Sequence, residues 1–328
     1  MDVSWRVKAL DAAMQATGQR IADATSVSEV QALRARRESL GAGPFSGVAD
    51  TLGGWVFGRR ASGVQVEDRT LPGPAGELGV RLYRDVATPE GAPLLVHLHG
   101  GGWVLGSLDG GDWWCSSVAA EAGVVVASVD YRLAPEHPAP AGIDDAVAAT
   151  RWLAEHAGEL DAGGPVAVGG DSAGGNLATL VALAARDGDG PPLAAQVLVY
   201  PAVDLTMSFP STLELADAPI LRRVDMEAFR SHYLDGSALA PDDARVSPWF
   251  AEDLAGLPAA LVQIAEQDPL RDEGRAYADR LRDAGVEVRA TEYVGAPHGF
   301  ASLPGACPQA ARQSVAEVAA FLRRHLHV

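Results

Sequence analysis

Cysteine is scarce in this sequence, which has only Cys115 and Cys307 among 328 residues. Two thiols are too few for a disulfide framework, so we expect both to be reduced in a cytoplasmic protein. Long apolar runs are also missing, since no stretch reaches the length that spans a bilayer. The N-terminus lacks the apolar core of a secretory signal peptide. These absences argue against a secreted disulfide scaffold and against stable membrane insertion.

Positive charge is also in short supply. The 26 Lys and Arg residues face 43 Asp and Glu residues, which gives a formal net charge of −17. Nucleic-acid phosphates and anionic lipid surfaces repel such a chain, so we expect neither as a partner. With 48% hydrophobic and 21% charged residues, the chain can bury one large core and has no signature of disorder.

Eight predicted strands alternate with stretches that suit helices. They lie at residues 64–70, 78–83, 94–98, 124–129, 166–168, 196–200, 260–265 and 287–293. A continuous apolar run such as 124–129 is typical of a strand that is buried on both faces of a parallel sheet. The alternation therefore predicts an α/β fold, with a mainly parallel eight-stranded sheet flanked by helices and antiparallel strands near its start.

Two segments interrupt this alternation. In residues 1–60, helical spacing relates Val3, Val7, Leu10 and Met14, and residues 205–245 separate two of the predicted strands. We expect both segments to be parts of a helical cap on a core formed by residues 61–204 and 246–328.

An amphipathic N-terminal helix could instead lie on a membrane. Its polar face mixes Asp2, Arg6, Lys8 and Asp11 and is not strongly basic, which disfavours membrane binding. The cluster of Arg34, Arg36 and Arg37 is interpreted as a solvated face.

A serine stands between an apolar run and a helix-compatible stretch, in the sequence GDSAGG at residues 170–175. On a strand-to-helix turn, the Ser172 side chain would project over the end of a sheet, and the glycines permit the sharp bend. Because Gly-x-Ser-x-Gly also occurs in ordinary glycine turns, the pattern alone leaves a nucleophile and a plain turn open. Asp171 and Asn176 are explained as polar groups of the turn and of the first helical turn.

Three consecutive glycines follow the strand at 94–98, in the sequence HGGGW at residues 99–103. Glycines leave backbone N–H groups bare, and bare N–H groups are what a developing oxyanion requires. The HGGG element and the Gly-x-Ser-x-Gly turn are both marks of lipase and esterase α/β-hydrolases. A flexible glycine loop is the alternative, which the preceding strand and the following aromatic disfavour.

A serine nucleophile needs a base and a carboxylate that orients the base. Asp268 lies in a turn after the strand at 260–265, and His298 is the one histidine in a loop after the last predicted strand. The order Ser172, Asp268, His298 is that of α/β-hydrolases, and it differs from the orders in trypsin and subtilisin.

Neighbouring acidic residues and histidines are alternatives to Asp268 and His298. Glu266 is assigned to the strand itself, and Asp272 and Glu273 suit the first turn of the next helix. His97 and His99, at i and i+2 on one predicted strand face, could bind a metal, but no third ligand accompanies them. We therefore expect neither a metal nor another cofactor.

Five motifs follow one another in the chain: HGGGW at 99–103, YRLAPEHPAP at 131–140, GDSAGGN at 170–176, DPLRDE at 268–273 and HGF at 298–300. Together they resemble the bacterial hormone-sensitive-lipase family (family IV) of carboxylesterases, which has the α/β-hydrolase fold and a cap over the acyl pocket. The prolines of the second motif prevent a helix and make a rigid connection, which we expect to support the oxyanion loop and the Ser172 turn.

The resemblance implies a role for each matching residue. Ser172 would be the nucleophile, His298 the general base and acid, and Asp268 the orienting carboxylate. Oxyanion-hole N–H groups would come from Gly101, Gly102 and Ala173, and the supporting residues of the loop would be His99 and Gly100. The expected partner is a small ester, hydrolysed through an acyl-enzyme with a preference for short acyl chains. Relatives often form dimers, so a homodimer stays open.

The sequence leaves alternatives open for the reaction and for the residues of the substrate pocket. An amidase or dehydratase would keep nearly the same machinery, and a non-catalytic receptor of this family would lack the histidine. Candidates for an apolar cleft that holds an acyl chain or aromatic alcohol are Trp103, Trp113, Trp114, Met207 and Phe209. Each of these side chains suits the protein core equally well.

Overall fold

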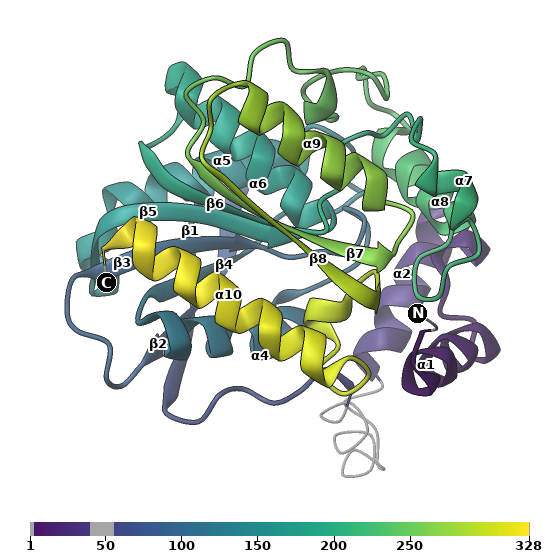
Figure 1. The fold of residues 1–328 in the computed structure, drawn as a ribbon, viewed down its shortest axis with the longest axis horizontal. Coiled ribbons are helices and arrows are strands. Elements are labelled where there is room, and N and C mark those ends of the chain that lie inside the picture. The colour runs from purple at the N-terminus through teal and green to yellow at the C-terminus, as the bar shows by residue number, and fades with distance from the viewer. Residues whose placement is uncertain (1–2, 40–55, 328) are drawn as a thin grey trace.

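A single eight-stranded sheet forms the centre of the computed structural model, which describes residues 3–39 and 56–327 (Figure 1). The strands are β1 (Val64–Gly73), β2 (Gly76–Asp85), β3 (Ala92–Leu98), β4 (Val125–Asp130), β5 (Ala162–Asp171), β6 (Leu193–Val199), β7 (Ala259–Gln267) and β8 (Val288–Pro297). Each overlaps one predicted segment, so all eight predicted strands are confirmed.

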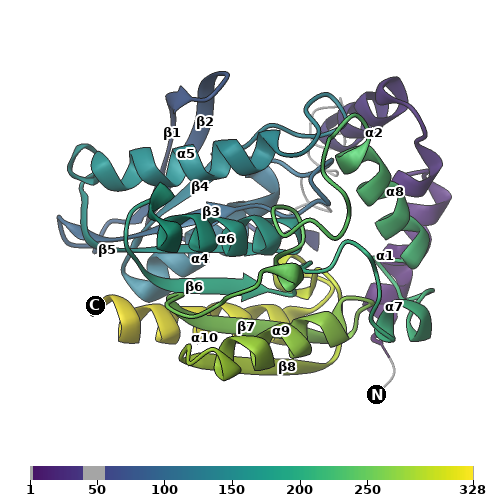
Figure 2. The same ribbon diagram turned by 90° about the horizontal axis from the view of Figure 1, so that it is seen from above.

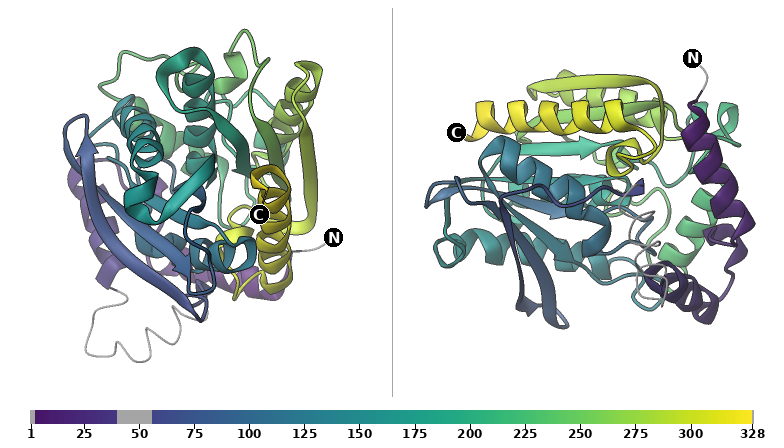
Figure 3. Two further views of the ribbon diagram at one scale, coloured as in Figure 1. Left: turned by 90° about the vertical axis from the view of Figure 1, so that its left-hand side faces the viewer. Right: turned by 90° about the horizontal axis from the view of Figure 1, so that it is seen from below.

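The strand order in the sheet is β1-β2-β4-β3-β5-β6-β7-β8. Strand β2 is antiparallel to both of its neighbours, β1 and β4, and every other pair is parallel. The expected antiparallel start is thus confirmed. Figure 3 shows the twisted sheet with β1 and β2 at one end and β8 at the other.

Helices cover both faces of the sheet (Figures 1 and 2). The main ones are α4 (Leu108–Ala122), α5 (Ala141–Glu155), α6 (Ala173–Ala184), α9 (Arg271–Asp283) and α10 (Pro308–Leu326). Helices α5, α6 and α9 lie on one face, and α4 and α10 lie on the other. Short helical segments are η2 (Ala157–Leu160), η3 (Ala185–Asp189), η4 (Pro248–Phe250) and η5 (Phe300–Ser302).

The apolar runs explain the two covered faces. In β4, Val125 and Ala127 belong to the hydrophobic cluster under α5 and α6, and Val126 belongs to the cluster under α4 and α10. Successive side chains of a strand point to opposite faces, so a strand that is buried on both faces is apolar along most of its length. Buried Ser128 is a polar exception in β4, and its hydroxyl lies 3.0 Å from His97 Nδ1.

The two segments that interrupt the alternation lie side by side (Figures 1 and 2). The first contains α1 (Trp5–Ala16), η1 (Ile21–Asp23) and α2 (Val27–Ser39), and the second contains α7 (Ser211–Glu214) and α8 (Arg223–Leu234). Buried Arg20 links them, because its guanidinium pairs with Asp225 of α8 at 2.8 Å and with Asp11 of α1. The predicted first segment also includes Asp2 and residues 40–55, which lie outside the described residues.

The prediction that Arg34, Arg36 and Arg37 form a solvated face was wrong for two of them. Arg36 is exposed, but Arg34 is only 21% exposed and Arg37 donates to the carbonyl oxygen of Gln19 at 2.7 Å. The reason is that α2 buries Val30 and Leu33, which brings the arginines beside them against the rest of the protein. Across residues 3–39 and 56–327, no helix has both the length and the apolar character needed to cross a membrane.

Candidate active site

Ser172 occupies a strained turn between β5 and α6. Its φ and ψ are 56° and −119°, a conformation that is costly for a residue with a Cβ. The turn is held by backbone bonds, since the Ser172 N–H donates to Val199 at 2.9 Å and its carbonyl accepts from Asn176 at 3.0 Å. Gly174 must be glycine because a Cβ there would overlap the carbonyl of Leu98 at the end of β3. The sharp bend expected from the sequence is therefore present.

Ser172, His298 and Asp268 come together at the carboxyl ends of β5, β7 and β8. His298 Nε2 lies 2.9 Å from Ser172 Oγ, and His298 Nδ1 lies 2.7 Å from Asp268 Oδ2. Asp268 is completely buried, and its other oxygen accepts the Leu270 N–H at 2.9 Å. The carboxylate accepts from Nδ1–H, which leaves Nε2 free to accept the serine proton. This is the geometry of a nucleophile, a base and an orienting group.

Left-handed backbone shapes the glycine loop that follows β3. Gly101, Gly102 and Trp103 have φ values of 119°, 62° and 60°. The N–H groups of Val104 and Leu105 donate to the Gly101 carbonyl at 3.2 and 2.8 Å. In the part of the chain that the structure describes, the N–H groups of Gly101 and Gly102 donate to no protein group. They are available as donors for an oxyanion.

The support of this loop comes from His99 and Tyr131. His99 Nδ1–H donates to the Gly100 carbonyl at 2.8 Å, and the imidazole stacks on Tyr131 with ring centroids 4.4 Å apart. The Tyr131 hydroxyl donates to the His99 carbonyl at 2.7 Å, and the Ala134 N–H donates to the Trp103 carbonyl at 2.9 Å. The 131–140 segment thus supports the loop, as its prolines predicted, and the contacts of Tyr131 add to this support.

Asp171 and Asn176 do more than the sequence predicted for them. Asp171 Oδ1 accepts the Gly100 N–H at 2.9 Å, so it ties the serine turn to the glycine loop. Asn176 is completely buried and donates to the carbonyls of Ala202 and Val246 at 2.8 and 2.9 Å. The prediction that both are local turn groups was wrong because their partners are distant in sequence.

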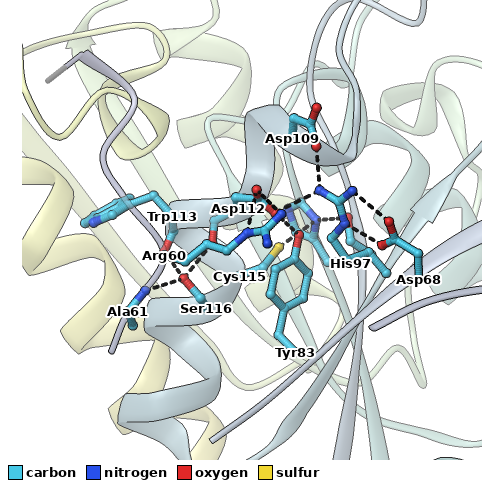
Figure 4. Close-up of polar contacts among 12 residues, drawn as sticks. Arg60, Ala61, Asp68, Tyr83, His97, Asp109, Asp112, Trp113, Cys115 and Ser116 are labelled. Carbon is cyan, nitrogen blue, oxygen red and sulfur yellow. Dashed lines mark hydrogen bonds and ion pairs between the residues drawn. The ribbon is translucent and has the colours of Figure 1, made fainter. Parts of the chain in front are cut away.

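Helix α4, which follows the glycine loop, is anchored by a polar cluster (Figure 4). Asp112 accepts from the Tyr83 hydroxyl at 2.7 Å and pairs with Arg60 at 2.8 Å and with Arg81 at 3.0 Å. Ser116 Oγ accepts the Ala61 N–H at 2.9 Å. These contacts hold the first half of α4 in place. Because α4 follows the glycine loop directly, they also hold the C-terminal end of that loop.

His97 and Cys115 form the inner part of the same cluster (Figure 4). The His97 Nδ1 lies 3.0 Å from Ser128 Oγ and 3.3 Å from Cys115 Sγ. Burial lowers the pKa of His97 to about 3 and raises the pKa of the Cys115 thiol. Both groups are therefore neutral near pH 7, and this pair is not a second nucleophilic site. Among the described residues, no three His, Cys, Asp or Glu side chains are arranged to hold a metal ion.

The five candidate pocket residues do not gather in one cluster. Trp103 and Met207 belong to the cluster under α5 and α6, and Trp113 and Trp114 pack in or against the cluster under α4 and α10. Phe209 packs edge-on against Trp249, with ring centroids 4.9 Å apart. Only Trp103 comes from the glycine loop itself, where it stacks on Tyr233 of α8 at 4.5 Å.

An aromatic residue that the sequence analysis did not single out packs directly on the glycine loop. Phe229 of α8 packs on Gly102 so tightly that a Cβ at Gly102 would overlap its ring. No motif marks Phe229, because an aromatic on an amphipathic helix is ordinary in a sequence. Its ring nonetheless packs directly on the glycine loop.

Glu273 lies in the first turn of α9, as the sequence predicted, but it also forms hydrogen bonds with the segment after β6. It is completely buried, and its Oε1 accepts the N–H groups of Val203 and Asp204 at 2.7 and 3.2 Å. Burial raises the pKa of Glu273 well above its ordinary value of 4.5, and nearby Asp204 and Asp268 act in the same direction. The carboxyl holds the chain where it leaves β6 beside the serine turn.

Replacing Glu273 by glutamine is expected to flatten the pH dependence of stability. Between pH 4.5 and the raised pKa, the unfolded chain loses this proton before the folded protein does, so folding becomes less stable as pH rises. Glu273→Gln keeps the acceptor oxygen but cannot ionise. Melting temperatures of both proteins from pH 5 to 9 should show the variant gaining relative to wild type as pH rises. A constant difference across this range would contradict a protonated Glu273.

Comparison with known proteins places this site in a family. The family model described as the α/β-hydrolase fold matches residues 95–302, which include the glycine loop, the serine turn, Asp268 and His298. The carboxylesterase NlhH of Mycobacterium tuberculosis is 44% identical over 278 residues, with 80% of this chain and 84% of that protein covered. This chain belongs to the hormone-sensitive-lipase (family IV) carboxylesterases. It is a carboxylic ester hydrolase, as its sequence predicted.

Two further relatives of the esterase are informative. The ethyl acetate hydrolase of Pseudomonas putida is 40% identical over 259 residues, with 76% of this chain and 79% of that protein covered. Among solved structures, the hyperthermophilic esterase of Pyrobaculum calidifontis is 36% identical, with a TM-score of 0.84 and 99% of each chain covered. Sequence and fold thus agree along almost the whole esterase.

Proposed function

We propose that the esterase hydrolyses small carboxylic esters through an acyl-enzyme on Ser172, with His298 as base and Asp268 as its orienting carboxylate. The observation that carries this proposal is the continuous hydrogen-bonded line from Ser172 Oγ through His298 to Asp268, at 2.9 and 2.7 Å. A base within hydrogen-bond reach of a serine hydroxyl is the requirement for activating it at neutral pH.

Acylation begins when Ser172 Oγ attacks the ester carbonyl carbon and its proton passes to His298 Nε2. The carbonyl oxygen becomes an oxyanion, which the N–H groups of Gly101, Gly102 and Ala173 would stabilise. The tetrahedral intermediate collapses with cleavage of the bond to the alcohol oxygen. The imidazolium returns its proton to that oxygen, and the alcohol departs.

Deacylation repeats these steps with water as the nucleophile. His298 takes one proton from the water as its oxygen attacks the acyl carbon, and the same oxyanion hole holds the second intermediate. The intermediate then releases the carboxylic acid, and Ser172 Oγ regains its proton from the imidazolium. Buried Asp268 accepts the Nδ1–H of His298 and so orients the imidazole in both halves of the cycle.

We also assign residues 1–60 and 205–245 to a cap that covers this site. Support comes from α1 and α2 lying beside α7 and α8, from the Arg20 to Asp225 ion pair at 2.8 Å, and from Phe229 packing on Gly102. A cytoplasmic location is part of the proposal, and the two free thiols support it.

The proposed substrates are esters with short acyl chains. Support comes from Phe229 packing on Gly102, from the stack of Trp103 on Tyr233, which puts aromatic rings against the glycine loop, and from a relative that is named for ethyl acetate hydrolysis. We expect kcat/KM on p-nitrophenyl esters to be highest for acetate to hexanoate and to fall toward palmitate. A maximum on palmitate, or on emulsified triglyceride, would contradict the short-acyl assignment. The matching p-nitroanilides should be turned over far more slowly than the esters, and the reverse order would identify an amidase.

A further inference from the structure

The side chain of Arg34 joins cap helix α2 to the glycine loop and to the segment that supports it. Its Nε–H donates to the Val104 carbonyl at 2.8 Å, and its Nη2–H donates to the Ala134 carbonyl. Its Nη1 pairs with both oxygens of Glu136, at 2.8 and 2.9 Å. All three nitrogens of the planar guanidinium thus form hydrogen bonds, one with the glycine loop and two with the 131–140 segment. Both segments are distant from α2 in the sequence.

The bond to Val104 leads directly to an oxyanion-hole donor. The Val104 carbonyl and the Leu105 N–H belong to one peptide unit, and that N–H donates to the Gly101 carbonyl at 2.8 Å. The Gly101 carbonyl and the Gly102 N–H belong to the next peptide unit in this line. Because each peptide unit is planar, fixing its oxygen also fixes the direction of its N–H. Hydrogen bonds in series also polarise one another, which strengthens the last donor.

Helix α8, in the second part of the proposed cap, packs against the same stretch of the glycine loop. Phe229 of α8 packs on Gly102, and Tyr233 of α8 stacks on Trp103. Trp103 has a left-handed φ of 60°, which is costly for a residue with a Cβ and indicates that the surroundings hold this part of the loop. The glycine loop is therefore held on two sides. Helix α2 contacts it through Arg34, and α8 contacts it through the rings of Phe229 and Tyr233.

We propose that Arg34 is a positioning residue, which aims the Gly102 N–H at the oxyanion and so makes catalysis depend on the docking of α2. The inference rests on the proposed function, because it assumes that Gly102 is an oxyanion donor. Arg34 touches no reacting atom and acts through the peptide units of Val104 and Gly101. Without it, substrate should still bind, but the transition state should be held less well.

The test compares three variants by kcat and KM per titrated active site, with p-nitrophenyl butyrate as substrate. Arg34→Met removes the fork but keeps a long stem, and Arg34→Lys keeps the charge opposite Glu136. The matched control is Gln31→Ala, because Gln31 donates from the same helix to the same Glu136 at 3.0 Å and, among the described residues, makes no hydrogen bond to the loop. Thermal unfolding checks that each variant is folded. If Arg34→Met does not fold, the comparison is made with Arg34→Lys alone.

We expect both Arg34 variants to lower kcat about 10- to 100-fold, less than the roughly 10²- to 10³-fold for outright loss of an oxyanion donor. KM should change little, and Gln31→Ala should behave like wild type. The inhibition constant of a trifluoromethyl ketone, whose adduct with Ser172 carries an oxyanion, should rise by the same factor as kcat falls.

Three outcomes would overturn the proposal. These are unchanged kcat in the Arg34 variants, an equal loss in Gln31→Ala, and a loss of kcat with no change in the ketone's inhibition constant. A failure of the proposed function looks different, since wild type itself would then resist the ketone or Ser172→Ala would stay active.

Discussion

Replacing Ser172 by alanine is expected to lower kcat by roughly 10⁴- to 10⁶-fold, because the three residues of a triad act as a unit and the nucleophile is lost. KM should change much less, since the pocket and the oxyanion donors remain. The measurement is steady-state hydrolysis of p-nitrophenyl acetate and butyrate, with protein freed of wild-type enzyme.

Ser237→Ala is the matched control for this variant. Ser237 is a half-buried serine after α8, and among the described residues its hydroxyl takes part in one hydrogen bond, from the Leu239 N–H at 3.1 Å. We expect its kcat to stay close to that of wild type. If Ser172→Ala kept activity within tenfold of wild type, another group would have to be the nucleophile.

Asp268→Asn is expected to lower kcat by about 10⁴-fold with little change in the fold. The carboxylate accepts the Nδ1–H of His298 at 2.7 Å, and the amide of asparagine can place an N–H donor there instead. The imidazole would then carry its proton on Nε2, where it could no longer accept the proton of Ser172. The variant should bind a substrate analogue normally, since no pocket residue has changed.

Glu266→Gln is the control for this second variant. Glu266 is at the end of the same strand, and it accepts the Gly295 N–H at 2.7 Å, a bond that glutamine preserves. Activity close to wild type is expected. An Asp268→Asn enzyme within tenfold of wild type, or an equal loss in Glu266→Gln, would contradict the orienting role of Asp268.

The sheet and the Ser172, His298 and Asp268 geometry could be predicted from the sequence because their signals are local. The run 124–129 is apolar at every position except Ser128, which is typical of a strand between two layers. The serine, aspartate and histidine each follow a predicted strand, and the carboxyl ends of parallel strands meet at one edge. The prediction therefore needed no knowledge of how distant side chains approach one another.

The contacts that hold the site could not be predicted in this way. Asp171 and Arg34 were interpreted as ordinary turn and surface groups, because such residues are common there. Their partners, Gly100 and Val104, lie 71 and 70 residues away in the chain. Such pairs depend on how the helices and loops pack, and one sequence does not reveal this. The candidate aromatics failed to form one cluster for the same reason, since α4 turns Trp114 toward the sheet.

The most direct measurement of the central claim is covalent labelling with a fluorophosphonate, followed by intact mass and peptide mapping. Ser172 Oγ would attack phosphorus, fluoride would leave, and the serine proton would pass to His298. The proposed mechanism predicts one adduct per chain, on Ser172, with activity lost in proportion to labelling. An active enzyme that gains no adduct, or one that is inactivated with the adduct on another residue, would contradict it.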